Sequence, residues 1–174
     1  MEENPERNIV NKVVVVTGSS RGIGANIVKT LAKKGYRVIL NYNKSENYAQ
    51  NVQKELINVD IFKADVSKRE EVQKLVDYVI KKYKKIDILI NNAGISQIKE
   101  FTQLTDEDWN NIINSNLNSA FFCSREAAKN MIHNKSGLII NISSIWGITG
   151  ASCEVAYSTS KAALNGFTKA LAKE

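Results

Sequence analysis

Short runs of apolar residues alternate along the chain with longer segments whose apolar positions recur every three or four residues. The first run is the valine stretch 13–16, and the segment behind it places Ile27, Val28 and Leu31 at helical spacing. Further apolar runs follow at 38–40, 61–62, 86–90 and 138–142. Nearly continuous apolar strands separated by helices predict a parallel sheet that is covered on both faces.

Polar residues and glycine mark where the helices begin and end. Gly35 ends the first helix, and a polar helix opens near Ser45. Residues 67–70, Ser-Lys-Arg-Glu, have the form of a capping box, and so do residues 105–108, Thr-Asp-Glu-Asp, ahead of a long helix through Leu117. We therefore expect a Rossmann-type, doubly wound α/β fold with right-handed crossovers and three layers, α/β/α.

Length and composition indicate a single domain. The chain has 174 residues, of which 43% are hydrophobic, and this is enough for one core. Residues 1–11 read as a polar leader that contains the only proline, Pro5, and residues 12–174 read as the folded domain. There are no internal repeats and no low-complexity linkers, so we expect no boundary inside the domain.

The net charge of +6 narrows the range of partners. The lysines are dispersed, and the densest run, at 81–85, ends a predicted helix, so we expect no nucleic-acid partner. A basic protein attracts a phosphorylated cofactor or an acidic carrier protein instead. No apolar stretch has the length of a signal peptide core or a membrane span, which predicts a cytoplasmic protein without a membrane partner.

Cysteine and histidine are too few and too scattered for a metal site or a disulfide framework. Cys123 and Cys153 form no C-x-x-C motif, and His133 is the only histidine. We expect no metal, and both cysteines are simplest as small core residues. Catalysis would therefore use oxygen and amine groups.

Two Tyr-x-x-x-Lys pairs occur, Tyr78 with Lys82 and Tyr157 with Lys161. This spacing puts an ammonium beside a phenol on one helix face, where it makes the phenol easier to ionise. Thirteen residues before the second tyrosine lies Ser144, directly after the apolar run that ends at position 142, whereas the same position before the first tyrosine holds an acid. Only the second pair has a hydroxyl partner at a predicted strand end.

A glycine-rich turn separates the first strand from the first helix. Residues 17–24 read Thr-Gly-Ser-Ser-Arg-Gly-Ile-Gly. Glycines here let the backbone approach a pyrophosphate, and the helix N-terminus faces its negative charge. Because the turn follows a strand and precedes an amphipathic helix, it favours dinucleotide binding over a simple tight turn.

Taken in order, the motifs resemble the short-chain dehydrogenase/reductase family from about Lys12 onward. The family's hallmarks are T-G-x-x-x-G-x-G, here at 17–24, N-N-A-G, here at 91–94, an asparagine on the long helix, here Asn116, and a serine before Y-x-x-x-K. The resemblance implies that Tyr157 protonates a carbonyl oxygen that receives hydride from NAD(P)H on its carbon. It further implies the roles of the other expected catalytic residues: Ser144 holds the same oxygen, Lys161 holds the nicotinamide ribose, and Asn116 orders a water; a helix-surface amide is the alternative for Asn116.

The expected cofactor contacts surround the glycine turn and the next strand ends. By the resemblance, Asp65 binds the adenine, and Asn92 with Gly94 lines the cleft; a support for a helix N-terminus is the alternative for Asp65. No acid ends the second strand to grip the ribose, and Arg21 and Lys44 can meet a 2′-phosphate, which favours NADP(H) over NAD(H). The alternative is that these two cations are solvated surface charges. The full expected set is Gly18, Ser20, Arg21, Gly22, Ile23, Gly24, Asn43, Asp65, Val66, Asn92, Ala93, Gly94, Tyr157 and Lys161.

Two groups within the family suggest different ketone substrates, free or bound to a carrier. The chain as a whole resembles the 3-oxoacyl-acyl-carrier-protein reductases, and Arg125 and Lys129 would face an acidic carrier. Residues 143–155 are similar to the elongation factor P 5-aminopentanone reductases, whose substrate carries a primary amine on elongation factor P. Glu154 would pair with that ammonium. A simple cap of the tyrosine helix is the alternative role of Glu154.

The resemblance also implies more sheet than this sequence encodes. Members of the family continue past the tyrosine helix into two more strands and a substrate lid. We therefore expect a sheet that is incomplete at its C-terminal end, with the strand at 138–142 as an apolar edge. A piece of a longer chain, an interrupted gene and a shortened, catalytically inactive cofactor-binding fragment are three explanations. The resemblance also predicts a homodimer or homotetramer built on the long helix and the tyrosine helix.

Overall fold

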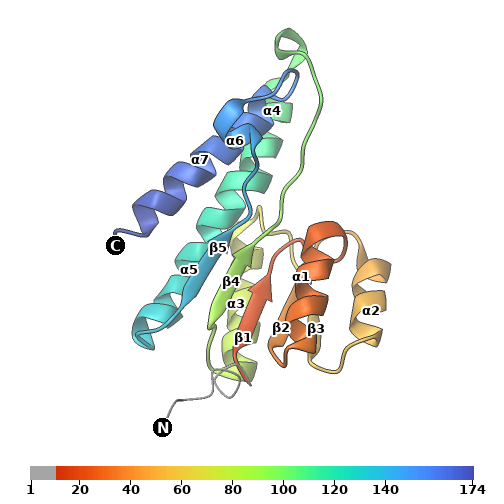
Figure 1. Ribbon diagram of the computed structural model, residues 1–174, viewed down its shortest axis with the longest axis vertical. Coiled ribbons are helices and arrows are strands. Elements are labelled where there is room, and N and C mark those ends of the chain that lie inside the picture. The colour runs from red at the N-terminus through yellow and green to blue at the C-terminus, as the bar shows by residue number, and fades with distance from the viewer. Residues whose placement is uncertain (1–10) are drawn as a thin grey trace.

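The computed structural model describes residues 11–174 and contains one sheet of five parallel strands flanked by helices (Figure 1). In spatial order the strands are β3 (Val59–Lys63), β2 (Arg37–Tyr42), β1 (Val13–Val16), β4 (Ile88–Asn91) and β5 (Leu138–Asn141). The helices are α1 (Gly22–Lys33), α2 (Glu46–Lys54), α3 (Arg69–Tyr83), α4 (Asp106–Ile113), α5 (Ser119–His133), α6 (Trp146–Thr149) and α7 (Val155–Leu171). The predicted doubly wound α/β fold is confirmed.

The four valines of β1 divide between two hydrophobic cores, one on each face of the sheet. Val14 and Val16 pack with α1 and α2, whereas Val13 and Val15 pack with α3 and α5. Successive side chains of a strand point to opposite faces, so a run of apolar residues is required where both faces are covered. All four valines are buried, which places β1 at the centre of the domain.

The direction of the strand order reverses next to β1. β2 follows β1 on one side, but the next strand on the other side is β4, which pairs Ile90 with Val16. In doubly wound sheets, ligands bind in the crevice outside the carboxyl ends of the strands at such a reversal. The fold therefore points to the loops after β1 and β4 as the ligand site.

Strand β5 forms one edge of the sheet, as the sequence predicted, and its apolar side chains are only partly covered. Leu138 is 50% exposed and Ile140 is 37% exposed. A groove of about 520 Å³ separates α1 from this part of the sheet, and it is lined by Ile23, Asn26, Ile27, Thr30, Leu31, Ile90, Ile140 and Ile142. The face of β5 that looks toward α1 thus lacks the cover that β1 receives.

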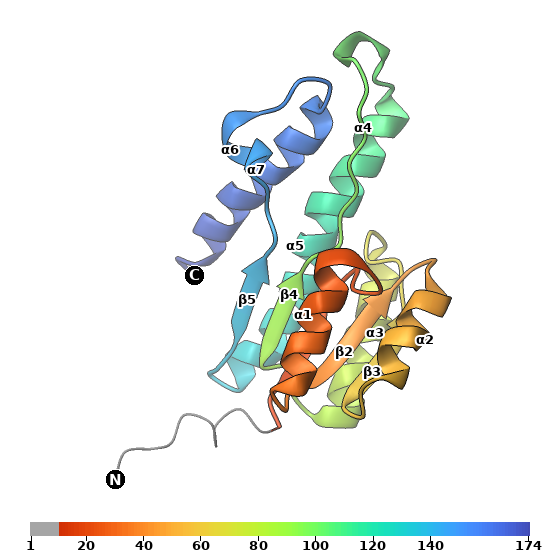
Figure 2. The same cartoon turned by 45° about the vertical axis from the view of Figure 1, so that its right-hand side comes forward.

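The predicted long helix is a rod of three parts, α4, the π-helical turn η3 (Asn114–Asn118) and α5, which follow one another along one direction in Figure 2. A π turn widens the helix locally and is frequent at functional sites. Its central residue, Asn116, is buried with 1% exposure. Within residues 11–174, neither this rod nor any other helix is long and apolar enough to cross a membrane.

One of the two predicted capping boxes forms and the other does not. Thr105 Oγ1 accepts from the backbone N–H of Asp108, and the Asp108 carboxylate accepts from the backbone N–H of Thr105, both at 3.1 Å. At the start of α3, Lys68 is the N-cap and makes no side-chain cap. The prediction for 67–70 was wrong because the Ser67 hydroxyl points toward the Asp65 carboxylate, to which it donates at 2.6 Å, and not toward the N–H groups of the helix.

Candidate active site

The glycine turn packs directly on the loop after β4. Gly18 has a φ of 58°, and a Cβ there would lie 2.7 Å from the Cα of Ala93, so only glycine fits. Its N–H donates to Asn41 Oδ1 at 3.1 Å, and the N–H of Ser19 donates to the Asn41 carbonyl at 2.8 Å. The buried Asn41 at the end of β2 therefore holds the turn, a role that the sequence analysis missed.

Thr17 and Asn92 tie the same two loops together. Thr17 Oγ1 accepts from the backbone N–H groups of Asn92 and Ala93, each at 3.0 Å. The Asn92 side chain donates to the carbonyls of Thr17 and Gly18 at 2.9 and 3.0 Å. Asn92 thus anchors the loop and is absent from the cleft lining, while Ala93 and Gly94 line the cleft. The role of Thr17 was missed, although the threonine that opens the T-G-x-x-x-G-x-G motif marks its position.

A cleft of about 140 Å³ opens at the carboxyl ends of the central strands, where the strand order reverses. Six of the predicted cofactor-binding residues line it, together with residues that the sequence analysis did not single out for this role. Ser20, Arg21, Gly22, Ile23 and Gly24 lie outside this lining, at the start of α1. The lining consists of Gly18, Asn41, Asn43, Ala64, Asp65, Val66, Ser67, Ala93, Gly94, Ile95 and Ser115.

Asp65 uses one carboxylate oxygen for its own loop. Oδ1 accepts from the N–H and the hydroxyl of Ser67 at 3.1 and 2.6 Å, and the Asp65 N–H donates to Glu71 Oε2 at 2.6 Å. Oδ2 accepts no hydrogen bond from residues 11–174. The carboxylate therefore supports the loop before α3 and keeps an acceptor for a ligand in the cleft it lines.

Arg21 and Lys44 remain without an ion-pair partner within the described residues. Arg21 is the N-cap of α1, Lys44 follows β2, and both side chains are exposed. The salt bridges among residues 11–174 involve neither of them, so their charges are open to an anion from solution. The N-terminus of α1, with Arg21 as its N-cap, favours a phosphate group.

Helix α7 carries Tyr157 and Lys161 on one face. The Lys161 ammonium lies 5.8 Å from the centre of the Tyr157 ring and donates to the Ile142 carbonyl at 2.8 Å. Lys161 is only 4% exposed and pairs with no carboxylate among residues 11–174. Burial lowers the pKa of its ammonium. The Tyr157 hydroxyl makes no hydrogen bond within the described residues, so it is free to meet a substrate.

Ser144 lies in the segment between β5 and α6, and this segment packs together with α6 on the Lys161 turn of α7. Its hydroxyl accepts from the Trp146 N–H at 3.2 Å. A Cβ at Gly147 would come within 2.7 Å of the Lys161 carbonyl carbon, and Ser143 Oγ donates to the Lys161 carbonyl at 3.2 Å. These contacts fix Ser144 relative to the helix that carries the tyrosine and the lysine.

Asn116 joins the π turn to both the N-N-A-G loop and α7. Its side chain accepts from the Ile95 N–H at 2.8 Å and donates to the Ile95 carbonyl at 2.9 Å. It also donates to Ser160 Oγ at 3.0 Å, and Ser160 donates to the Tyr157 carbonyl at 2.7 Å. A surface role is wrong because the amide is buried, and its role toward a water stays a prediction. Ser160, three residues after the tyrosine, was missed.

Gly94 connects the cleft to the tyrosine helix. A Cβ at Gly94 would lie 3.2 Å from Asn116 Oδ1 and 3.5 Å from Lys161 Nζ. The space beside Gly94 is therefore bounded by the π turn on one side and by the buried ammonium on the other. Lys161 is not among the residues that line the cleft, but its ammonium lies beside Gly94, which does line it. Doubly wound sheets bind dinucleotides in such a crevice, and the roles of Asp65 and Lys161 toward a cofactor stay predictions.

Cys123 and His133 lie on α5 away from this site, whereas Cys153 is half-buried in the segment before α7, so only Cys123 is the core residue that the sequence predicted. Cys123 packs in the core with α5, and burial raises the pKa of its thiol to about 12. Among residues 11–174, no three side chains of histidine, cysteine, aspartate or glutamate gather closely enough to hold a metal ion.

Residues 12–174 match the model of the family described as short chain dehydrogenase. The chain is 38% identical over 170 residues to the oxidoreductase YmfI of Bacillus subtilis, covering 95% of this chain and 69% of that protein. It is 39% identical over 167 residues to a 3-oxoacyl-[acyl-carrier-protein] reductase of Synechocystis, covering 94% of this chain and 68% of that protein. The fold is also similar to the crystal structure of a metagenomic short-chain oxidoreductase in complex with NADP, with a TM-score of 0.91, 32% identity, and coverage of 95% of this chain and 76% of that one.

Proposed function

The chain belongs to the short-chain dehydrogenase family, and from this membership we propose that it reduces a ketone to a secondary alcohol with NADPH. The observation that carries the proposal is the pair on α7, a phenol without a hydrogen-bond partner within residues 11–174 beside a buried ammonium. The ammonium of this pair lies next to Gly94, which lines the cleft. A proton donor at the end of a dinucleotide cleft has the geometry that carbonyl reduction requires.

The protein side of the reaction is a proton transfer from Tyr157. Its hydroxyl donates a proton to the carbonyl oxygen, and the resulting phenolate is stabilised by the Lys161 ammonium. The Ser144 hydroxyl holds the same oxygen and orients the carbonyl. The Ile142 carbonyl and Asn116, through Ser160, keep the lysine and the tyrosine in place. Bound NADPH supplies the hydride.

The cofactor would lie along the cleft from Asp65 to Lys161, with its pyrophosphate at the glycine turn and the start of α1. The 2′-phosphate would meet Arg21 and Lys44, which have no carboxylate partner among residues 11–174. The solved relative with bound NADP supports this choice. We expect Arg21→Ala to weaken NADPH binding about tenfold and NADH binding little, since only NADPH carries the extra phosphate. Titrations of both cofactors by fluorescence measure this; equal losses contradict the phosphate role.

The direct test of function is NADPH oxidation in the presence of a 3-oxoacyl thioester. We expect consumption of NADPH that requires the ketone and produces one alcohol for each NADPH. A chain that binds NADPH but leaves it unconsumed with every ketone would instead support the other reading, a cofactor-binding fragment without catalysis. A chain that does not bind NADPH contradicts both.

An acyl-carrier-bound 3-oxoacyl chain is the substrate class that the Synechocystis relative supports. The two residues expected to bind an acidic carrier, Arg125 and Lys129, already share an acidic partner within the chain. Arg125 pairs with Glu126 at 3.2 Å, and Lys129 is hydrogen-bonded to the same carboxylate. Two cations minus one anion leave a single net positive charge, so the rest of the basic surface would have to contribute to carrier binding.

A ketone that carries a primary amine, as on a modified elongation factor P, is the second candidate, and one observation favours it. Glu154 Oε2 and Ser158 Oγ are both buried without a hydrogen-bond partner among the described residues. Glu154 is the N-cap residue of α7 and its side chain makes no capping bond. It precedes Tyr157 by three positions and Ser158 by four, the spacings at which side chains on a helix are neighbours. A buried carboxylate oxygen without a donor favours a ligand that brings an ammonium.

The two substrate classes are separated by Glu154→Gln. We expect this variant to lower kcat/KM about tenfold or more on an aminoketone and to leave a neutral 3-oxoacyl substrate nearly unchanged, because only the first brings a cation to the carboxylate. Equal effects on the two substrates would remove the aminoketone candidate.

We also propose assembly as a homodimer or homotetramer through the rod α4–η3–α5 and α7. The two elements already pack against each other within the subunit. Analytical ultracentrifugation measures the state; a monomer at micromolar concentration contradicts the proposal.

A further inference from the structure

The loop between β4 and α4, residues 92–105, is held to the helical rod at two points. The first is Asn116, which binds both backbone groups of Ile95. The second is Asp108 in the first turn of α4. Its Oδ1 accepts from Gln97 Nε2 at 2.8 Å, and its Oδ2 accepts from Lys99 Nζ at 2.5 Å. The segment 95–99, which we call the fastened segment, is thus bonded to the rod at both of its ends.

The same carboxylate also belongs to the capping box with Thr105, so one side chain has two tasks. Oδ2 accepts from the Thr105 hydroxyl at 2.8 Å and from its N–H at 3.1 Å. Hydrogen bonds from Lys99, Gln97 and Thr105 hold the pKa of Asp108 well below its usual range. Helix capping alone explains the bonds to Thr105, but it does not require the bonds to Gln97 and Lys99.

The fastened segment is bonded to the chain that leads into α7. The Lys99 N–H donates to the Cys153 carbonyl at 2.8 Å. Cys153 precedes Tyr157 by four residues and adopts a φ of 58°, which is unfavourable for a residue other than glycine and indicates a backbone held by its surroundings. Ile98, which lies between Gln97 and Lys99, is 80% exposed. Its side chain contributes to neither core and lies between two side chains that are bonded to Asp108.

We propose that Gln97, Lys99 and Asp108 form a clasp that positions the substrate-side wall of the site, made of the fastened loop and the segment before α7. The clasp acts on substrate binding and orientation through Lys99 and the Cys153 backbone, and it takes no part in the proton transfer. This inference rests on the proposed reductase function for its kinetic consequence. Its structural consequence, the coupling of 95–101 to 150–154, is independent of turnover.

The test compares two variants, each of which removes a different donor to the Asp108 carboxylate. Lys99→Met removes the ion pair of the clasp and leaves the capping box intact. Thr105→Ala removes the cap hydroxyl and leaves Gln97 and Lys99 bound. Lys99→Arg restores a cation at the same place and serves as the conservative rescue.

Hydrogen exchange and steady-state kinetics are the two readouts. In Lys99→Met, we expect faster amide exchange in both 95–101 and 150–156, KM for the ketone raised about tenfold, and kcat and the NADPH dissociation constant within about twofold of the parent. Lys99→Arg should return both readouts toward the parent values. Thr105→Ala should change exchange only around 105–109.

The inference is overturned if 150–156 exchanges in Lys99→Met as it does in the parent, or if Thr105→Ala raises KM as much as Lys99→Met does. A parent chain that does not turn over would count against the reductase proposal only. In that case, the exchange rates at 150–156 still decide whether the clasp exists.

Discussion

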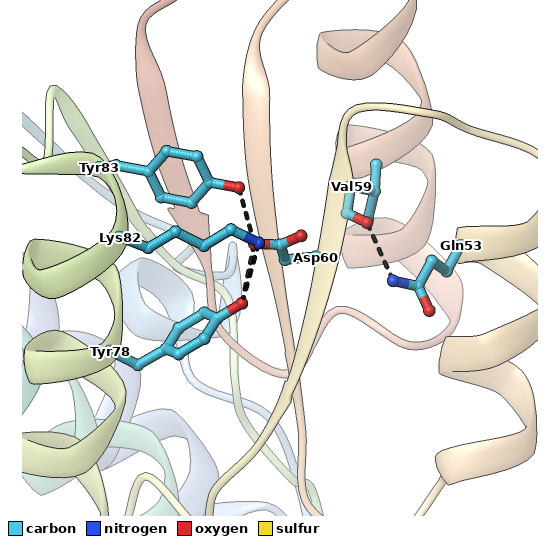
Figure 3. A network of polar contacts seen from close by, with 6 residues as sticks. All are labelled: Gln53, Val59, Asp60, Tyr78, Lys82 and Tyr83. Carbon is cyan, nitrogen blue, oxygen red and sulfur yellow. Dashed lines mark hydrogen bonds and ion pairs between the residues drawn. The ribbon is translucent and has the colours of Figure 1, made fainter.

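Helices α3 and α7 each carry a tyrosine followed four residues later by a lysine, but the two pairs have opposite surroundings. On α3, Tyr78 and Lys82 converge with Tyr83 on the carboxylate of Asp60 from the edge strand β3 (Figure 3). The three donor–acceptor distances to this carboxylate lie between 2.5 and 2.9 Å. On α7, no carboxylate among residues 11–174 approaches Lys161.

The electrostatic consequences for the two lysines differ in sign. The hydrogen bond to Asp60 raises the pKa of the Lys82 ammonium, whose side chain is 47% exposed. Burial lowers the pKa of the Lys161 ammonium, which has no carboxylate partner among residues 11–174. The first arrangement satisfies every charge and joins α3 to β3, whereas the second keeps a buried cation available beside a phenol.

The phenols differ in the same way. The Tyr78 hydroxyl donates to Asp60 and accepts from Lys82 at 3.3 Å, so it has no capacity left for a substrate. The Tyr157 hydroxyl has no hydrogen-bond partner within residues 11–174. The same spacing therefore gives a structural cluster on α3 and a candidate proton donor on α7. The difference is that Asp60 binds the pair on α3.

Removing each phenol oxygen should give the largest difference between the two pairs. We expect Tyr157→Phe to lower the rate of ketone reduction about 10²- to 10⁴-fold with NADPH binding retained, because only the transferable proton is lost. Tyr78→Phe should leave reduction unchanged and cost about 1 kcal/mol of stability through one lost hydrogen bond. Reductase assays and thermal unfolding measure both. Parent-level reduction by Tyr157→Phe would end the assignment.

Replacing each lysine by methionine should separate stability from function. Lys82→Met removes a paired cation, and we expect a loss of about 1 kcal/mol, or roughly 2–4 °C in Tm, with reduction intact. Lys161→Met removes a buried charge that no carboxylate among the described residues balances, so we expect an unchanged or higher Tm together with loss of reduction. Calorimetry and the reductase assay check these outcomes. A clear drop in Tm for Lys161→Met would show that its ammonium stabilises the fold.

The smallest expected effect is a difference in pH dependence. Since the folded pKa of Lys161 is lowered, the charged form destabilises the fold at neutral pH, and this cost disappears as pH rises toward the unfolded value of about 10.4. The stability gap between the parent and Lys161→Met should therefore shrink with rising pH. For Lys82, the folded pKa is raised, so its contribution is fully present below about pH 10.4 and is lost only above it.

Urea unfolding between pH 7 and pH 10 measures the two gaps. The gap between the parent and Lys82→Met should stay constant over this range. Parallel behaviour of the two variants would contradict the opposite environments of the two lysines.

Much of the fold and of the candidate site follows from local sequence. The apolar pattern predicted the strands and helices, because a short continuous apolar run indicates a strand buried on both faces, and a period of about 3.6 residues indicates a helix buried on one face. Gly18, Ala93 and Gly94 were predicted from motifs, and the cleft brings them together. The prediction for 67–70 failed because an acid two positions earlier competed for the serine hydroxyl.

Other features depend on contacts between distant parts of the chain. Thr17 meets Asn92, 75 residues away, and Asn116 meets Ser160, 44 residues away. No local pattern marks such a pair, since the energy comes from burying a hydrogen bond that only the complete packing creates. The role of Asn116 at the centre of a π turn likewise has no counterpart in the helical spacing that predicted the rod.

By itself, the sequence determined the doubly wound α/β class, the order of the elements and the family, because these depend on periodicity and on motifs within a few residues. It also named both tyrosine–lysine pairs, since the spacing of four residues is a local property of a helix. Only the tertiary structure decided what each pair has around it. Packing brought Asp60 to Lys82 from 22 residues away and left Lys161 buried against the Ile142 carbonyl. The free energy of a charge depends on its neighbours in space, and those neighbours come from the fold.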